Sequence, residues 1–185
     1  MGDFFILWTA LAVALFWSFG AYNRLVRLRA RAIAAFPAVE HQLRQYVTLV
    51  QGNFPASGPG MAATQDRVQA ELISAWAGLV GSAEQFDASL RAARGSPLNA
   101  STMHALTLAQ QTLFTSWWRL KDEPHDLAGA LLPETLQLQW DRISQLADNV
   151  RQEFNGHVDA YNEAIEQFPA TALAWLFGFK PAAVI

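Results

Sequence analysis

Phe4 to Tyr22 reads FFILWTALAVALFWSFGAY, a run of 19 residues without a charged side chain. A helix of this length is about 28 Å long, close to the roughly 30 Å thickness of a bilayer's hydrocarbon core. Trp8 and Trp17 lie toward the ends of the run, where amphipathic rings favour the headgroup level. The run therefore predicts a transmembrane anchor over residues 1–22.

Two other structures are compatible with this run, a cleaved signal peptide and a buried core helix. A signal peptide needs a basic start, whereas this chain begins Met-Gly-Asp. An A-x-A pattern at Ala12–Ala14 falls in the middle of the apolar run instead of following it. A fully apolar helix at a terminus is unusual in the core of a soluble domain. We therefore favour the uncleaved anchor.

The charges that flank the run predict its orientation. Four arginines follow it before the next acidic residue, Glu40, occurs. They are Arg24, Arg27, Arg29 and Arg31. By the positive-inside rule, the chain after Tyr22 lies in the cytoplasm and the N-terminus lies outside. The same arginines can meet anionic headgroups, so the lipid bilayer is the first expected partner.

The composition of the whole chain of 185 residues excludes several classes of function. Apolar residues make up 52% and charged residues 16%, against about 45–50% and about 25% in typical soluble proteins, which agrees with a membrane segment. The net charge of −3 leaves no basic surplus to neutralise phosphates, so we expect no nucleic-acid partner. The absence of cysteine excludes disulfides, thiolate metal sites and cysteine nucleophiles.

The sequence after the anchor predicts long helices. The first continues from the membrane to Gly52, and Pro37 should kink it at a cost of about 3 kcal/mol unless packing compensates. Its apolar seam is Leu25, Leu28, Ala32, Ala35, Val39, Gln42, Tyr46 and Leu49. After a Gly- and Pro-rich loop at 52–60, a second helix should cover 62–94. Its stripe is Val68, Leu72, Trp76, Leu79, Ala83, Phe86 and Leu90.

Two further helices follow. The third should begin at an N-cap formed by Asn99 or Ser101, and the fourth should run from Pro133 to Phe168. A short helical turn at 127–132 is expected between them. The third helix carries Met103, Leu106, Leu113, Phe114, Trp117 and Leu120 on its stripe. The fourth carries Leu136, Ile143, Leu146, Val150, Phe154, Val158, Tyr161, Ile165 and Phe168.

These features predict an all-α fold. No long segment alternates with period two, and no Asn-Gly or Asp-Gly hairpin signal occurs. A single amphipathic helix cannot bury its own stripe, so the four must share one core. We expect an N-terminal transmembrane helix that runs into a long antiparallel four-helix bundle over residues 23–169.

Two asparagines recur at an interval of seven near the C-terminus, in Phe154-Asn155-x-x-Val158 and Tyr161-Asn162-x-x-Ile165. They are followed by Phe168-Pro169 and by Phe177-Gly178-Phe179. This pattern resembles the signature of the LemA family, YN-x-x-V-x-x-YN-x-x-I-x-x-FP followed by A-x-x-F-G-F. The opening Tyr22-Asn23-Arg24-Leu25-Val26-Arg27-Leu28-Arg29 resembles the family's YN-x-LV-x-LR. The chain departs from the family at Thr48–Phe54, where D-L-I-P-N-L-V is usual.

The resemblance implies a single-pass protein of the bacterial inner (cytoplasmic) membrane with a helical-bundle domain and no established biochemical activity. Asn155 and Asn162 lie on one face of the fourth helix, beside the seam. We expect their amides to hydrogen-bond to the first helix near Asn23 and to fix its register, as a polar seam residue does in coiled coils. The alternative is a polar ligand site inside the bundle.

The tail, residues 170–185, is predicted to be membrane-proximal. An alternating bundle returns Phe168-Pro169 to the bilayer beside Tyr22 and Asn23. Trp175, Phe177 and Phe179 would then enter the interface, with Lys180 at the headgroups. The alternatives are a subunit contact and simple capping of the lower end of the bundle.

No catalytic constellation is recognised, so we expect no enzyme activity, no cofactor and no metal. Di-iron bundle proteins need Glu-x-x-His motifs on two helices, whereas here Glu153 and His157 are four residues apart. The other histidines, at 41, 104 and 125, occupy unrelated positions. The chain has no G-x-S-x-G, Walker or G-x-G-x-x-G motif.

Two functions therefore remain open. The first is a membrane-anchored scaffold or assembly protein that acts through helix–helix contacts, as a homo-oligomer or with another membrane protein. The adjacent pair Trp117-Trp118 favours this function, because the two rings cannot both enter one narrow seam. Trp175 and Phe177 are further candidate interface residues. The second is a ligand-sensing bundle that signals through a partner membrane protein.

Overall fold

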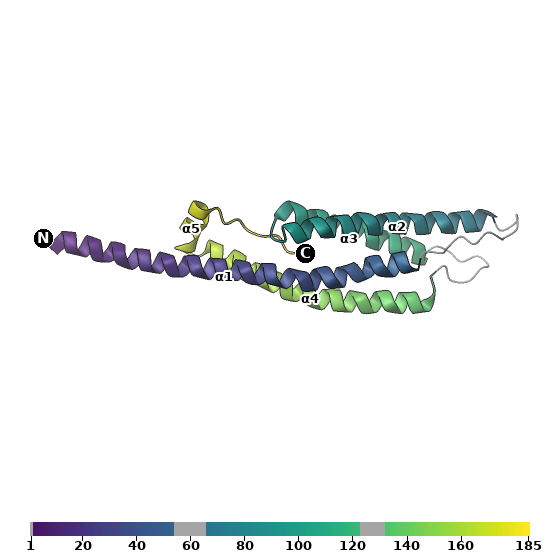
Figure 1. Cartoon of the computed structure of the whole chain (residues 1–185), viewed down its shortest axis with the longest axis horizontal. Coiled ribbons are helices and arrows are strands. Elements are labelled where there is room, and N and C mark those ends of the chain that lie inside the picture. Colours follow the sequence, from purple (N-terminus) through teal and green to yellow (C-terminus); the bar gives the residue numbers. More distant parts are fainter. Residues whose placement is uncertain (1, 54–65, 123–131) are drawn as a thin grey trace.

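The computed structural model describes residues 2–53, 66–122 and 132–185 (Figure 1). Its five helices are α1 (Gly2–Gly52), α2 (Asp66–Gly95), α3 (Ala100–Asp122), α4 (Glu134–Glu166) and α5 (Ala170–Phe177). No strand occurs in these ranges, so the described part of the chain is all-helical. Residues 54–60 of the loop expected at 52–60, the start of the second helix at 62–65 and most of the turn expected at 127–132 lie outside the described residues. The same holds for the side chains of Val68 and Leu72 on the predicted stripe of the second helix.

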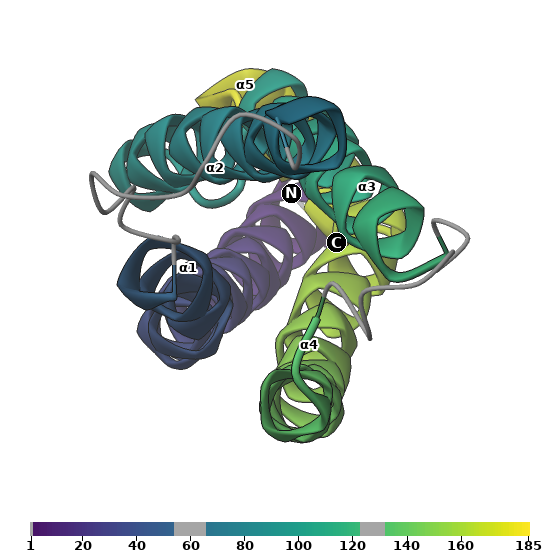
Figure 2. The ribbon, with the colours of Figure 1, turned by 90° about the vertical axis from the view of Figure 1, so that its right-hand side faces the viewer.

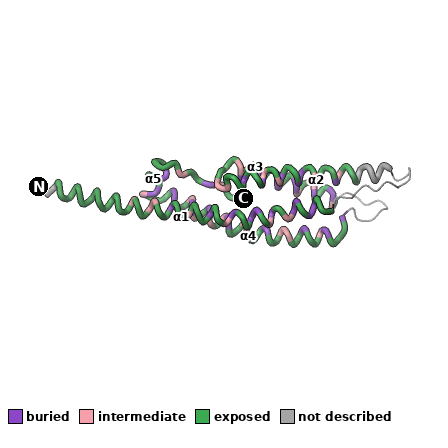
Figure 3. Tube along the Cα trace, in the orientation of Figure 1, coloured by how far each residue is buried: buried purple, intermediate pink, exposed green. Residues whose placement is uncertain are grey.

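Helix α1 combines two environments in one continuous element. Residues 4–17 of this helix are exposed (Figure 3), and by length and composition its N-terminal part is long and apolar enough to cross a membrane. Its C-terminal part is packed, with Leu25, Ala32, Val39 and Tyr46 at intervals of seven almost fully buried. The helix continues through Pro37, and its ribbon curves in this second half (Figure 1).

The long helices pack in pairs. Helix α1 lies along α4, α2 lies along α3, and α1 also contacts α2. Seen along the long axis, α1 and α4 occupy the lower part of the body, with α2 and α3 above them (Figure 2). Helix α5 contacts α4 and α1. The core therefore forms where the apolar stripes of the long helices face one another.

Most of the predicted seam residues are buried, with two corrections on α4. Leu146 is exposed because Ala147, one position along, faces the core instead. Phe168 is exposed because α4 ends at Glu166 and Gln167 adopts an extended conformation, so helical spacing no longer applies beyond it. Sequence spacing also missed Trp140, which is buried.

An aromatic cluster connects α3 and α4 to α1. The rings of Trp117 and Trp140 stack with centroids 4.0 Å apart and an interplanar angle of 6°. Phe114 lies 5.3 Å from Trp140, and Tyr46 of α1 lies 4.6 Å from it. The Tyr46 hydroxyl donates a hydrogen bond to Ser144 Oγ at 2.9 Å, and burial raises the pKa of Tyr46. Large aromatic rings thus connect α3 to α4, although the backbones of these two helices do not approach each other closely.

The start of α3 confirms one of the two predicted caps. Asn99 Oδ1 accepts hydrogen bonds from the backbone N–H groups of Ser101 at 2.9 Å and Thr102 at 3.4 Å. This is the geometry of an N-cap asparagine, which satisfies amides that have no partner inside the helix. Asn99, and not Ser101, is therefore the cap.

Candidate functional site

The chain after α4 folds back over the rest of the molecule. It turns at Gln167 to Pro169, forms α5, and then runs as an extended tail over residues 179–185 (Figure 1). Helix α5 lies across the direction of α1 instead of along it. It ends at Gly178, whose φ of 71° is left-handed, and the N–H of Phe179 bonds back to the carbonyl of Ala174 at 2.9 Å. A glycine suits this C-terminal position because a residue with a Cβ atom is strained at a positive φ.

Two asparagines of α4 bind the backbone of the tail. Asn162 Nδ2 donates to the carbonyl of Ala182 at 2.9 Å, and Asn162 Oδ1 accepts from the N–H of Ala182 at 2.8 Å. Asn155 makes the same pair of bonds with Ile185, at 2.9 Å and 3.0 Å. We call Asn155, Tyr161 and Asn162 the tail clamp, because the Tyr161 hydroxyl binds the same segment.

The distance between the two asparagines along α4 matches the distance between the two tail residues that they bind. Seven residues of helix rise about 10.5 Å, and three residues of extended chain span about 10 Å. Asn155 and Asn162 therefore meet Ile185 and Ala182 in register. An asparagine amide has a donor and an acceptor side by side, as the edge of a strand does, whereas an aspartate would lack the donor.

This geometry corrects the predicted role of the asparagines. Both amides bind the tail and not α1, and Asn23 is exposed on α1. The tail is the better partner because its extended backbone offers an N–H and a carbonyl that no helix uses. The sequence identified the residues from their spacing, but nothing in that spacing indicates which segment they bind.

Tyr161 adds a third contact to the clamp. Its hydroxyl donates to the carbonyl of Lys180 at 3.1 Å, and its ring is buried. Burial raises the pKa of Tyr161, and the cation of Arg29 opposes this in part. The hydroxyl therefore stays protonated and able to donate at neutral pH.

Aromatic rings join α5 and its flanks to α1. We call these rings, which belong to Trp17, Tyr22, Phe168, Phe177 and Phe179, the aromatic collar. The ring of Phe168 lies 5.9 Å from that of Trp17, and the rings of Phe177 and Phe179 lie 5.0 Å and 5.9 Å from Tyr22. The collar places α5 beside the last turns of the apolar run. Just beyond it, Arg24 Nη1 donates to Gln167 Oε1 at 2.9 Å.

The structure separates the four candidate interface residues. Trp117 lies in the aromatic cluster and is buried, so it is not available to a partner. Trp118 is 46% exposed, with Lys121 Nζ 4.7 Å from its ring centroid. Trp175 and Phe177 are exposed on α5. The prediction that one tryptophan of the adjacent pair is surplus to the core is confirmed.

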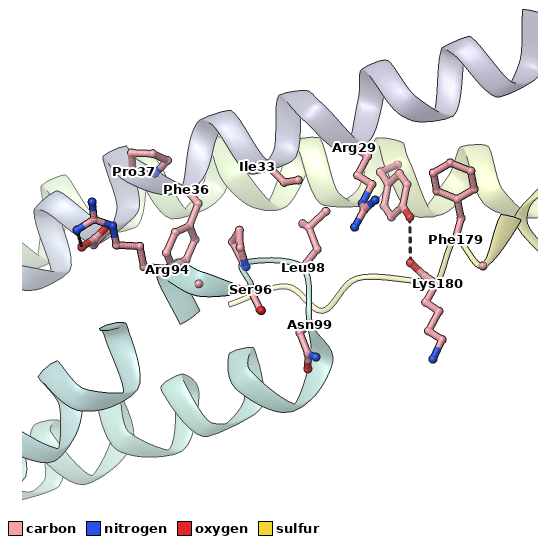
Figure 4. A pocket seen from close by; sticks show the side chains of 15 residues that line it. Arg29, Ile33, Phe36, Pro37, Arg94, Ser96, Leu98, Asn99, Phe179 and Lys180 are labelled. Atoms are coloured by element: carbon pink, nitrogen blue, oxygen red, sulfur yellow. Dashed lines mark hydrogen bonds and ion pairs between the residues drawn. The ribbon is translucent and has the colours of Figure 1, made fainter. Parts of the chain in front are cut away.

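A cavity of about 650 Å³ lies between α1, the α2–α3 turn and the start of the tail (Figure 4). Its lining includes the cations Arg29, Arg94 and Lys180, and one acidic side chain, Glu40. Glu40 Oε1 pairs with Arg44 at 2.6 Å and with Arg94 at 3.6 Å. No local sequence signal marks this cavity, because its walls come from four distant segments, one of which is α4 through Tyr161. Within the described ranges, no three His, Cys, Asp or Glu side chains gather closely enough to hold a metal ion.

Comparison of this chain with protein-family models, with curated proteins and with solved structures gives no match.

Proposed function

We propose that this chain is a membrane-anchored scaffold or assembly protein whose helical body acts through helix–helix contacts with a second copy or with another membrane protein. The observation that carries the proposal is the continuity of α1. Its exposed apolar part passes into its packed part without a linker. A body attached in this way keeps a fixed height and direction relative to the bilayer, which suits a protein that positions others.

The proposal has a finer form. The long helices would form an antiparallel four-helix bundle on the cytoplasmic side of a bacterial inner membrane, as in a LemA-like protein. Its support is the motif residues, since Tyr22, Tyr161, Asn162, Phe168 and Gly178 all lie around α5 and the tail. Residues that recur in one motif and meet at one place are expected to share one role.

An exposed aromatic side chain of the body supports a role in assembly. Trp118 on α3 is large, apolar and 46% exposed, and it lies well away from the apolar part of α1. Aromatic side chains that are surplus to a core are common anchors of protein interfaces. Trp118 is therefore the first residue to test.

Crosslinking in vesicles tests the scaffold. The full chain carries no cysteine, so Trp118→Cys supplies the only thiol, and Ala105→Cys supplies an exposed thiol on a different face of the same helix. We expect a disulfide-linked dimer at position 118 and little at position 105. Equal crosslinking at both positions, or a uniform monomer in mild detergent, would refute self-assembly.

The cavity favours a second candidate function, a ligand sensor that signals through a partner membrane protein. Its wall contains both α1 and the tail, so a bound ligand would change how these two segments contact each other. The lining holds three cations, Arg29, Arg94 and Lys180, against the single carboxylate of Glu40, which favours an anion. Calorimetry with inorganic phosphate and with succinate, on the full chain and on Arg29→Gln, tests this role. Absence of heat with both anions would argue against it.

A further inference from the structure

Helix α5 exposes its largest side chains, whereas two of its alanines face the protein. Ala170 and Ala174 are buried, whereas Trp175 is 85% exposed and Leu176 and Phe177 are 66% and 57% exposed. Phe168, just before the helix, is 76% exposed. A helix on the surface of a soluble body shows the opposite arrangement, with its large apolar side chains toward the core. The eight residues of α5, ATALAWLF, include no charge.

The aromatic collar fixes the position of this face relative to the apolar run. Phe168 contacts Trp17 and Phe177 contacts Tyr22, and these two α1 residues are separated by about 8 Å of helix. An interfacial helix enters the boundary between headgroups and acyl chains by about 5–10 Å. With α1 spanning the bilayer, α5 lies at this boundary. Helix α5 lies across α1 (Figure 1), so its axis runs roughly along the plane of a bilayer that α1 spans.

The charges beside α5 match an anionic lipid surface. Arg24 and Arg27 follow the collar on α1, Lys180 follows Gly178 in the tail, and all three are exposed. Arg24 and Arg27 both come after the apolar run on α1. Cations next to an apolar face are typical of elements that rest on anionic membranes.

Both ends of α5 are held by the body. Its start follows α4 directly, and its end continues into the tail that Asn155 and Asn162 bind to α4. The exposed face is therefore held in place and is not a frayed terminus. In the tail, Ala182 is buried and Phe179, Ala183 and Ile185 are partly buried, so the large apolar face that is open to lipid is that of α5 and Phe168.

We propose that α5 and Phe168 form a second membrane contact, which lies in the interfacial layer of the leaflet from which α1 emerges and is kept there by the tail clamp. The partner is a lipid surface with anionic headgroups. The proposal rests on the anchoring of α1 proposed above. With α1 as the first contact and α5 as the second, the rotation of the body about α1 is fixed as well as its height above the bilayer.

Single spin labels on the full chain test the contact in vesicles of phosphatidylcholine and phosphatidylglycerol. Leu176→Cys reports on α5, and Leu138→Cys on α4 is a matched control, since these leucines are 66% and 63% exposed. Ala12→Cys reports on the apolar run. Collision with oxygen, which concentrates in acyl chains, is compared with collision with a water-soluble nickel chelate. We expect an oxygen-to-nickel ratio several-fold higher at position 176 than at 138, and highest at 12.

The outcomes distinguish this inference from the anchoring itself. If positions 176 and 138 give the same ratio while position 12 is shielded from nickel, the second contact does not exist and the anchor stands. If position 176 is shielded from both reagents and its spectrum is broadened by a neighbouring label, a second copy covers α5 and the lipid contact is wrong. If position 12 is as open to nickel as 138, the anchor fails and the inference fails with it.

Discussion

At the scale of single residues, the tail clamp shows how side chains can pair with backbone. Asn155 and Asn162 hold residues that lie 30 and 20 positions further along the chain. The pairing depends on the amide groups and on the backbone of the tail, and not on the side chains of Ala182 or Ile185. The asparagines should therefore be hard to replace.

Replacing either asparagine by leucine of similar size should release the tail. Asn162→Leu removes two hydrogen bonds, each with a net contribution of about 0.5–1.5 kcal/mol, and leaves the backbone of Ala182 without its partner. The melting temperature of the full chain in mild detergent should fall by about 2–4 °C per kcal/mol lost. The amide of Ala182 should also exchange faster with deuterium. The control Asn149→Leu, at an exposed position of the same helix, should change neither.

Tyr161 should make the clamp sensitive to alkali. Burial raises its pKa in the folded chain, whereas the unfolded chain ionises near the ordinary value of 10.0. The stabilisation by the neutral hydroxyl is therefore complete below about pH 10 and is lost as the pH rises through the raised pKa. Melting temperatures measured from pH 8 to pH 11 should fall less above pH 10 in Tyr161→Phe than in the unchanged chain. Parallel curves would show that this hydroxyl does not contribute.

At the scale of elements, two glycines of the motif region should respond in opposite directions. Gly178 is left-handed at the end of α5, where alanine costs about 1–2 kcal/mol, so Gly178→Ala should lower the melting temperature. Gly156 lies inside α4 with open space where a Cβ would be, so Gly156→Ala should stabilise by about 0.5–1 kcal/mol. Thermal unfolding of the two variants tests both expectations. Stabilisation by Gly178→Ala would contradict the assigned end of α5.

The aromatic cluster should control how α4 is held against α3 and α1. Trp140 contacts the rings of Trp117, Phe114 and Tyr46, so Trp140→Ala should cost about 3–5 kcal/mol. Trp118→Ala, at a half-exposed neighbouring position, should change stability by less than about 0.5 kcal/mol. Thermal unfolding of the two variants distinguishes a ring of the core from one available to a partner. Equal losses would place Trp118 in the core.

The sequence predicts some of these elements because spacing alone determines which side of a helix faces inward. Leu25, Ala32, Val39 and Tyr46 were predicted as a seam and are buried. Phe168 was misplaced because spacing does not report where a helix stops. The sequence does not predict which segment binds the asparagines, since Ala182 and Ile185 are bound through backbone groups that every residue possesses. Contacts of that kind have no compositional signal.

At the scale of the whole molecule, α1 joins every other part. It passes from the apolar run through the aromatic collar and on to the aromatic cluster with α3 and α4. A change of tilt at one end is therefore carried to the other by a single helix. The scaffold function proposed above would use this rigidity, and the side of the membrane on which the body lies would then decide which partners it meets.

The arginines after the apolar run predict that the body lies in the cytoplasm. Leu138→Cys places one thiol on the exposed surface of α4, and Gly2→Cys places one before the apolar run. In intact cells, a maleimide that cannot cross membranes should label position 2 and leave position 138 unlabelled until the cells are made permeable. The opposite pattern would place the body outside, where the tail clamp and the cavity would face other partners. Labelling of both thiols in intact cells would mean that α1 does not cross the bilayer, because a spanning helix must separate its two ends.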